Sequence, residues 1–221
     1  MESAGSGNPY KLSRFSLWID AVGGYLVCPS SEILVGQATA NSNVDVAVVA
    51  DIAAKHFRLT RNPDFYVLEP LADLFLDGQL VTVKTPLKDG QRIRLKGGVE
   101  FKFRKPHPLS MTATLDIVSR QRTRPWSDGI LLMADSCLVG PSPRNHVVCV
   151  QWRSDLVFFR REDQLCMRSS KPYTVDGQPQ NGVSNLGLNS RVVGEDYSFS
   201  LESVPNFIET GQDSGSQANC E

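Results

Sequence analysis

The chain has 221 residues, of which 41% are apolar, so we expect packed cores in one large or two small domains. Its 23 basic and 24 acidic side chains leave a formal charge of -1, which removes any global electrostatic argument for a nucleic-acid or membrane partner. The five cysteines are irregularly spaced, which predicts no disulfide framework. The sequence has no resemblance to a secretory signal and no long apolar run, so we predict a cytoplasmic protein without a membrane partner.

Short strands dominate the predicted secondary structure. Residues 1–14 and 206–221 are rich in Ser, Gly, Asn, Gln and acidic residues, which predicts flexible tails. Between them, runs of aliphatic, β-branched and aromatic residues alternate with Gly, Pro, Asn and Asp, as in strands and turns. Strands are predicted for VDVAVV (44–49) and for FSLWI, GYLVC, EILVG, FRLTR, FYVLEP, LFLDG, RIRL and VEFKF. Without long amphipathic helices, the sequence predicts an all-β fold.

The predicted strands occur as two copies of one unit. Three pairs of segments correspond in the same order: GYLVCPSSEILVG (24–36) with GILLMADSCLVG (129–140), LFLDGQLV (74–81) with YTVDGQPQ (173–180), and VEFKF (99–103) with DYSFSL (196–201). We therefore predict two tandem β-sandwich domains, residues 15–118 and 127–205. The segment 119–126 between them is charged and contains Pro125, which predicts a linker. Trp126 is expected to pack one repeat against the other.

Four short motifs in the first repeat follow one another in a recognisable order. They are EILVGQ, DIAAKHFRL, LFLDGQLV, and LKDGQRIRL followed by VEFKF. On these motifs, residues 15–118 resemble a forkhead-associated (FHA) domain. Residues 127–205 resemble a more degenerate copy, in which Pro141 follows the glycine of the first motif. The resemblance implies a β-sandwich whose loops at one end bind a phosphothreonine peptide.

The residue types that would bind phosphate are missing at the matched positions. The family pattern has Arg after the glycine, Ser and His in Ser-x-x-His, and an Asn-Gly turn, and these positions hold Gln37, Ala53, His56, and Asp77 with Gly78. Gln37 carries no charge, Ala53 has no side-chain donor, and Asp77 would repel a phosphate. Losing two charged hydrogen bonds of about 1.5–3 kcal/mol each would weaken binding by roughly two to four powers of ten. We therefore predict no phosphothreonine recognition.

The resemblance still indicates a candidate peptide-binding surface, made of Gln37, Ala53, Lys55, His56, Asp77 and Gly78. His56 also has a structural explanation, because its two ring nitrogens can fix neighbouring backbone, and Gly78 can serve a turn that needs positive φ. We predict a non-catalytic protein-interaction or scaffold module whose protein or peptide partner is unphosphorylated or basic. The alternative is a phosphopeptide-binding signalling adaptor in which Lys55 or Arg58 supplies the charge from a displaced position.

No enzyme, cofactor or metal site is predicted. The three histidines are accompanied by neither a Gly-x-Ser-x-Gly elbow nor a phosphate-binding glycine loop. His146 and Cys149 have a spacing that zinc ligands can use, but a zinc site needs four ligands.

A basic stripe extends from Lys84 to Lys105, where Arg92, Arg94 and Lys96 alternate on one predicted strand face. It lacks the interleaved aromatic residues of single-strand nucleic-acid binders, so nucleic acid is not the expected partner. We interpret the stripe as a solvated strand that protects a sheet edge.

Overall fold

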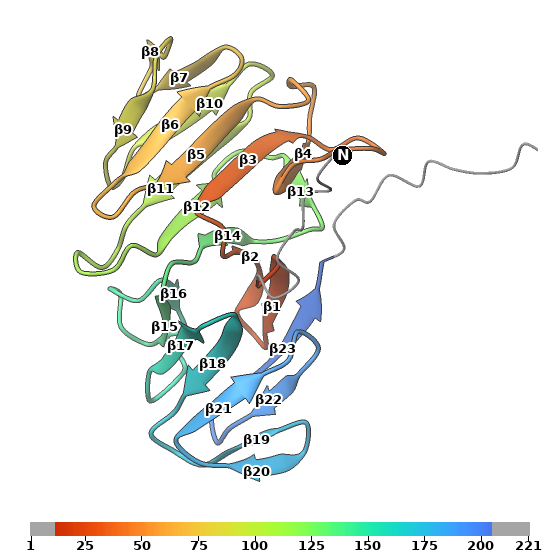
Figure 1. The fold of residues 1–221 in the computed structure, drawn as a ribbon, viewed down its shortest axis with the longest axis vertical. Coiled ribbons are helices and arrows are strands. Elements are labelled where there is room, and N and C mark those ends of the chain that lie inside the picture. The colour runs from red at the N-terminus through yellow and green to blue at the C-terminus, as the bar shows by residue number, and fades with distance from the viewer. Residues whose placement is uncertain (1–11, 205–221) are drawn as a thin grey trace, which may run out of the picture.

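The computed structural model describes residues 12–204 and contains only strands and connecting loops in that range (Figure 1). The predicted all-β fold class with β-sandwich architecture is confirmed. The described residues include no helix that is long and apolar enough to cross a membrane. The predicted tails lie outside the described residues, apart from residues 12–14. Of these, Arg14 is buried and donates hydrogen bonds to the carbonyl oxygens of Val44 and Asp45.

Three sheets build the molecule. The first short sheet has the order β13 (Arg122–Arg124), β4 (Val46–Val49), β3 (Glu32–Gln37), β5 (Phe57–Arg61), β6 (Tyr66–Pro70) and β9 (Thr85–Leu87). The second short sheet has the order β16 (Val147–Val148), β15 (Ser136–Gly140), β17 (Leu156–Arg161), β18 (Gln164–Arg168) and β21 (Val183–Leu186). The two sheets therefore share one strand plan, to which β13 is added in the first.

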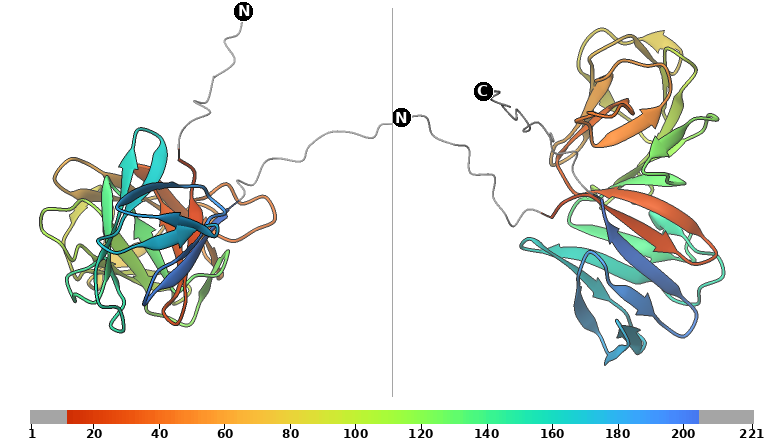
Figure 2. Two further views of the ribbon diagram at one scale, coloured as in Figure 1. Left: turned by 90° about the horizontal axis from the view of Figure 1, so that it is seen from below. Right: turned by 90° about the vertical axis from the view of Figure 1, so that its right-hand side faces the viewer.

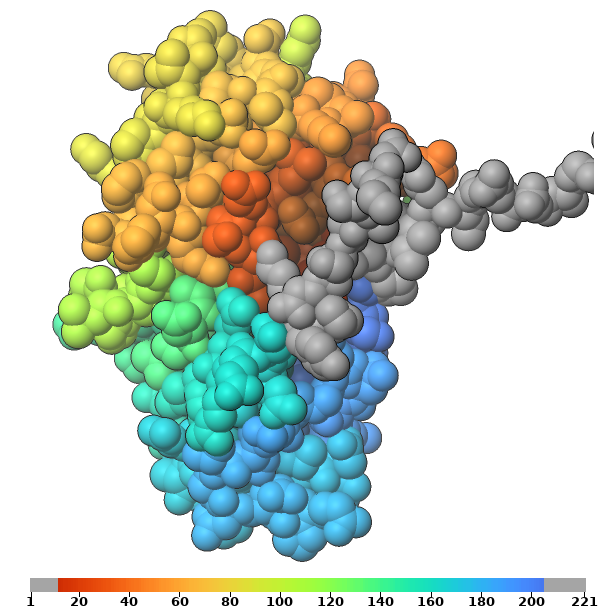
Figure 3. All heavy atoms as spheres, in the orientation of Figure 1, coloured from red at the N-terminus to blue at the C-terminus, as the bar shows by residue number. Residues whose placement is uncertain are grey.

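The long sheet has 12 strands and runs through both halves of the molecule. Its order is β20 (Gln178–Gln180), β19 (Tyr173–Val175), β22 (Arg191–Val193), β23 (Ser198–Ser203), β1 (Phe15–Ile19), β2 (Gly23–Cys28), β14 (Gly129–Leu132), β12 (Ala113–Ile117), β11 (Glu100–Arg104), β10 (Arg92–Leu95), β7 (Leu74–Leu76) and β8 (Gln79–Leu80). One end packs against the first short sheet and the other against the second, which gives two stacked sandwiches (Figures 1 and 3).

Two apolar cores result, and the parallel pair β2 and β14 contributes to both. Leu26 on β2 and its neighbour Ile130 on β14 lie in the first core, whereas Val27 and Leu131 lie in the second. This division follows from strand geometry, because successive side chains point to opposite faces of a sheet. The two sandwiches are therefore joined through a shared sheet and not through a flexible connection.

The hairpins that open the two repeats are exchanged between the sandwiches. The hairpin β1–β2 starts the chain, yet β1 pairs with β23, which comes from the other end of the sequence (Figure 2). In the structure the second repeat begins with β12, ahead of the predicted start at residue 127, and β12 of the hairpin-like unit β12–β14 pairs with β11 of the first repeat. Counted outward from the β2–β14 pair, the two halves of the long sheet have matching strand orders. Each repeat thus completes the sheet of the other.

The observed arrangement differs from the sequence-based boundaries 15–118, 119–126 and 127–205. Phe15, Leu17 and Ile19 belong to the second core, although their strand begins the first repeat. The expected linker contains β13, which pairs with β4, and Thr123 at its centre is 4% exposed. The charged residues around Thr123 conceal a short pattern of period two.

Trp126 follows β13 and stacks on Trp18 of β1, with ring centroids 5.8 Å apart and an interplanar angle of 15°. Because β13 belongs to the first sandwich and β1 to the second, this stack joins the two sandwiches.

Candidate functional site

His56 fixes the loop between β4 and β5. Its ring is buried, with the residue 2% exposed. The backbone N–H of Ala53 donates to Nδ1 at 3.2 Å, so the proton of the neutral ring is on Nε2, which donates to the carbonyl oxygen of Asp73 at 3.0 Å. Burial lowers the pKa of His56, and the hydrogen bond to Asp73 opposes this shift only in part. Both ring nitrogens therefore serve the fold.

Gln37 ends β3 and supports the same loop through its backbone. Its N–H donates to the carbonyl oxygen of Ala53 at 3.1 Å, and its carbonyl oxygen accepts a hydrogen bond from Ser42 Oγ at 2.8 Å. The preceding Gly36 allows a close approach, because a Cβ there would lie 2.0 Å from the carbonyl oxygen of Ala54. The Gly-Gln motif thus has a packing function that needs no ligand.

Asp77 and Gly78 form the tight turn between β7 and β8. Their φ angles of 48° and 85° match the left-handed conformation of type I′ hairpin turns. The Asp77 carboxylate accepts hydrogen bonds from the backbone N–H of Arg92 and from Gln91 Nε2, both at 2.9 Å. These contacts fasten the turn to β10 and occupy both carboxylate oxygens.

The second repeat builds its turn in the same way. Asp176 and Gly177 have φ angles of 52° and 79°, and the Asp176 carboxylate accepts the backbone N–H of Arg191 at 2.7 Å. Because the arrangement recurs where no Ser-x-x-His motif accompanies it, we interpret the Asp-Gly pair as a turn device in both repeats.

A pocket of about 590 Å³ opens beside His56. The loops β4–β5, β6–β7 and β10–β11 line it with Asp51, Ile52, Ala53, His56, Ala72, Asp73, Lys96 and Gly97. Of the six sequence-predicted site residues, the pocket brings together only Ala53 and His56. Gln37 lies behind the loop, and Asp77 and Gly78 belong to the separate turn. Lys55 is exposed outside the lining.

Sequence reasoning missed the residues that the other two loops supply. Two hydrogen bonds to His56 hold Ala72 and Asp73 at the pocket. The N–H of Ala72 donates to the carbonyl oxygen of His56, and the His56 ring donates to the carbonyl oxygen of Asp73. Lys96 and Gly97 come from the turn after β10. Lys96 belongs to the basic stripe seen in the sequence. Nothing in the sequence, however, indicated that this lysine lies beside the Ala53 loop.

The pocket is poorly suited to an anion. Asp51 and Asp73 are exposed carboxylates, Lys96 is the one cation in the lining, and neither arginine nor a side-chain hydroxyl is part of it. Phosphate recognition depends on charged donors that converge on the phosphate oxygens. The lining is better matched to a cationic or hydrogen-bond-donating group.

Three of the other basic residues singled out from the sequence are held in ion pairs. Arg58 forms an ion pair with Glu69 at 3.3 Å. In the basic stripe, Arg92 pairs with Glu100 and Arg104 with Asp116. These contacts partly neutralise the outer face of β10 and β11.

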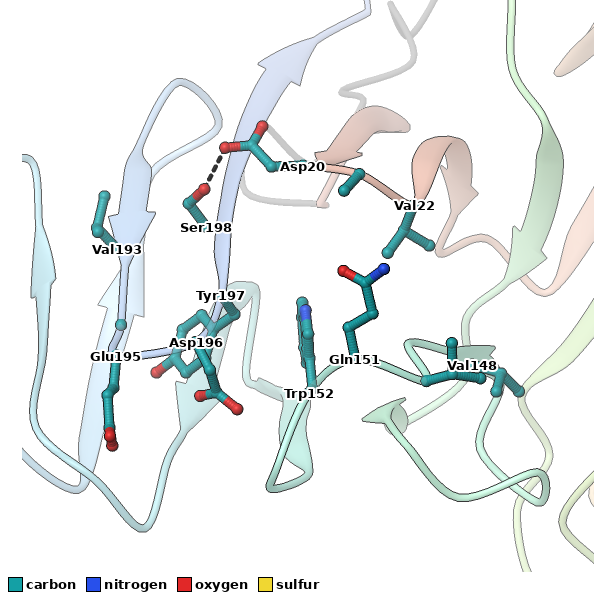
Figure 4. A pocket seen from close by; sticks show the side chains of 13 residues that line it. Asp20, Val22, Val148, Gln151, Trp152, Val193, Glu195, Asp196, Tyr197 and Ser198 are labelled. Carbon is teal, nitrogen blue, oxygen red and sulfur yellow. Dashed lines mark hydrogen bonds between the residues drawn. The ribbon is translucent and has the colours of Figure 1, made fainter.

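A second pocket, of about 550 Å³, lies at the corresponding end of the second sandwich (Figure 4). The loops β16–β17 and β22–β23 and the turn of the exchanged β1–β2 hairpin line it. Trp152 and Tyr197 lie side by side in the lining, with ring centroids 5.2 Å apart, and both are buried. The exchanged hairpin therefore supplies one wall of a pocket whose other walls belong to the second repeat.

Three carboxylates belong to the same lining. Asp20 accepts a hydrogen bond from Ser198 Oγ, drawn as a dashed line in Figure 4. Glu195 pairs with Lys171 at 2.7 Å, and this hydrogen bond lowers the pKa of Glu195. Asp196 accepts the backbone N–H of Arg153. The second pocket thus also combines acidic groups with an apolar lining.

The chain has a partial likeness to a solved structure. No protein-family model matches the chain, and no curated protein matches it. Among solved structures, part of the chain is similar to Mycobacterium tuberculosis EmbR in complex with a low-affinity phosphopeptide. The identity is 20%, the match covers 42% of this chain and 24% of that chain, and the TM-score is 0.32.

Proposed function

We propose that the chain is a non-catalytic protein-interaction or scaffold module built from two FHA-like sandwiches that have lost the phosphothreonine contacts. In this proposal the loop ends bind an unphosphorylated, basic segment of a partner protein. The observation that carries it is the His56 pocket, whose lining includes the exposed residues Asp51 and Asp73 and in which both nitrogens of His56 are bound by backbone.

Buried thiols are compatible with a reducing, cytoplasmic location. Four cysteines lie in the described part of the chain, all unpaired and buried: Cys28, Cys137, Cys149 and Cys166. Burial raises the pKa of the first three thiols to about 12, so they remain protonated and unreactive at neutral pH. The proposed module requires no metal, cofactor or catalytic residue.

The alternative function is a phosphopeptide-binding adaptor that uses a displaced basic residue. Arg58 is engaged by Glu69, and Lys55 lies outside the pocket lining. Lys96 is the cation that the pocket offers, so this alternative now depends on Lys96. Removing its charge would then abolish phosphopeptide binding.

A peptide titration separates the two functions. The full chain is titrated with a library of phosphothreonine peptides and with unmodified, basic twins, and binding is followed by fluorescence anisotropy. We expect the basic twins to bind and Asp73→Asn to weaken their binding. Asp77→Asn, which removes a carboxylate outside the pocket, is the matched control and should leave binding unchanged. A preference for the phosphorylated forms above about tenfold, lost in Lys96→Gln, would establish the alternative instead.

A further inference from the structure

An exposed group of basic and apolar side chains follows β13 at the edge of the first short sheet. This β13 edge patch consists of Val49, Arg120, Arg122, Arg124 and Trp126, and it borders a groove of about 620 Å³. It lies apart from the His56 pocket, because the two linings share no residue. Figure 1 shows β13 beside β4 at the end of the sheet.

Arg122 and Arg124 share one face of β13, Arg120 precedes the strand, and none of the three has an acidic partner within the described part of the chain. Arg120, Arg122 and Arg124 are all exposed, whereas Thr123 between two of them is buried, as the alternation of a strand requires. No ion pair of residues 12–204 involves any of the three. Three guanidinium groups are therefore available to a ligand.

The backbone edge of β13 is also open. Within residues 12–204, β13 pairs with β4 alone. The carbonyl oxygen of Val48 accepts the N–H of Ala38, so Val48 directs its backbone groups toward β3. Backbone groups point alternately to the two sides along a strand, so the N–H and C=O of Val49 point toward Arg122 of β13. The N–H and C=O of Thr123 therefore point away from the sheet. An extended segment can therefore hydrogen-bond along this edge.

Edge protection alone does not explain the patch. Two other edge strands, β9 and β20, contain a proline, which removes a backbone donor and blocks strand addition. The strand β13 itself contains none, and Pro125, which directly follows it, ends the row of backbone donors after Thr123. Trp126 is 46% exposed and Val49 57% exposed, and an edge that only repels other chains has no use for exposed apolar side chains.

We propose that β13 is a docking strand for an acidic, extended peptide of a partner protein, which pairs with the open edge and places carboxylates opposite the arginines. Alternate side chains of an extended strand lie about 6.6 Å apart, so acidic residues at every second position match the spacing of the arginines. Guanidinium groups can bind carboxylates through two parallel hydrogen bonds. The exposed face of Trp126 and the Val49 methyl groups provide apolar contact at the same groove.

Two other ligands of the β13 edge, a second copy of the chain and a single-stranded nucleic acid, fit the patch less well than an acidic peptide does. Pairing of β13 with β13 of a second copy would set arginine against arginine, which is unfavourable for directly opposed residues. Single-stranded nucleic acid would match the charge, but it gains much of its affinity from successive stacking aromatics, and the patch exposes one tryptophan. The proposal concerns a different surface from the His56 pocket and remains valid whatever that pocket binds.

Binding to the full chain is measured by fluorescence anisotropy with a labelled peptide of about ten residues that carries glutamate at alternate positions. Two control peptides replace glutamate by lysine or carry N-methyl groups on alternate backbone amides. We expect the first peptide to bind, and both changes to weaken binding at least about tenfold. The variant Arg120→Gln/Arg122→Gln/Arg124→Gln should lose affinity to a similar degree.

A matched variant removes the same charge elsewhere on the first sandwich: Lys88→Gln/Lys102→Gln/Lys105→Gln. It should bind the acidic peptide as the unmodified chain does, because none of these lysines borders the groove. Equal affinity for the N-methylated peptide would overturn strand pairing. Equal losses in the two triple variants would overturn the assignment to β13, as would tighter binding of an oligothymidine of the same length.

Discussion

Replacing His56 by alanine tests whether the histidine of the candidate site serves the fold. The substitution leaves the N–H of Ala53 and the carbonyl oxygen of Asp73 without their ring partners. Each lost hydrogen bond costs about 1–1.5 kcal/mol, and the removed ring adds a packing loss, so the free energy of unfolding should fall by about 2–4 kcal/mol. Because water can enter from the adjoining pocket, the lower part of this range is expected.

The assay is urea denaturation of the full chain followed by tryptophan fluorescence, combined with amide hydrogen exchange of Ala53. Exchange at this amide should accelerate in His56→Ala, because its acceptor is gone. The matched control is Lys55→Ala, one residue away and exposed, which should change stability by less than about 0.5 kcal/mol. A loss in His56→Ala as small as that of the control would refute the structural function of His56.

Three further predictions concern pH, connectivity and packing. Burial lowers the pKa of His146 to about 4, so the folded state binds this proton less readily than the unfolded chain. The free energy of unfolding, measured by urea titration, should therefore be highest above about pH 6.5 and decrease by about 3 kcal/mol as the pH falls toward 4. The variant His146→Gln should show a smaller pH dependence. Ser16 on β1 and Glu202 on β23 lie opposite each other because the hairpins are exchanged, so Ser16→Cys/Glu202→Cys should form a disulfide under mild oxidation. The control Ser16→Cys/Arg104→Cys should form none. Mass spectrometry that gives the reverse result would mean that β1 pairs with β11. Gly36→Ala should lower the free energy of unfolding by at least about 2 kcal/mol in the same urea assay, because its Cβ would meet a carbonyl oxygen at 2.0 Å, and an unchanged value would contradict the close packing of β3 on the loop.

The strands of the first repeat could be predicted because their burial alternates with period two. RIRL, for example, became β10, with Ile93 and Leu95 buried and Arg92 and Arg94 exposed. The short β13 escaped detection because its single inward residue, Thr123, is polar and is flanked by charges. Patterns of so few residues contain too little apolar signal to distinguish a strand from a linker.

The exchange of hairpins could not be predicted from the pattern of residues. The strand β1 would meet an equivalent partner whether it paired with β11 or with β23, since both close the corresponding position of a sandwich. The apolar sequence of β1 fits either half of the long sheet. The choice is set by the whole arrangement around the β2–β14 pair, which brings strands from the two repeats together.

The six residues of the predicted surface do not gather in one place. Ala53 and His56 line a pocket, whereas Asp77 and Gly78 form a turn that belongs to β7 and β8. Their place in the sequence could not reveal this, because the loop that contacts His56 is the preceding one, which contains Asp73. Backbone hydrogen bonds between loops leave no residue pattern.

The most direct test of the account is amide chemical-shift mapping of the full chain, labelled with ¹⁵N, during titration with a basic peptide and with a phosphothreonine peptide. The account predicts that the basic peptide shifts the amides of Ala53 and Asp73, and that the phosphothreonine peptide leaves the loop end unchanged. Saturable shifts of the Gln37 and Ala53 amides by the phosphothreonine peptide alone would contradict it.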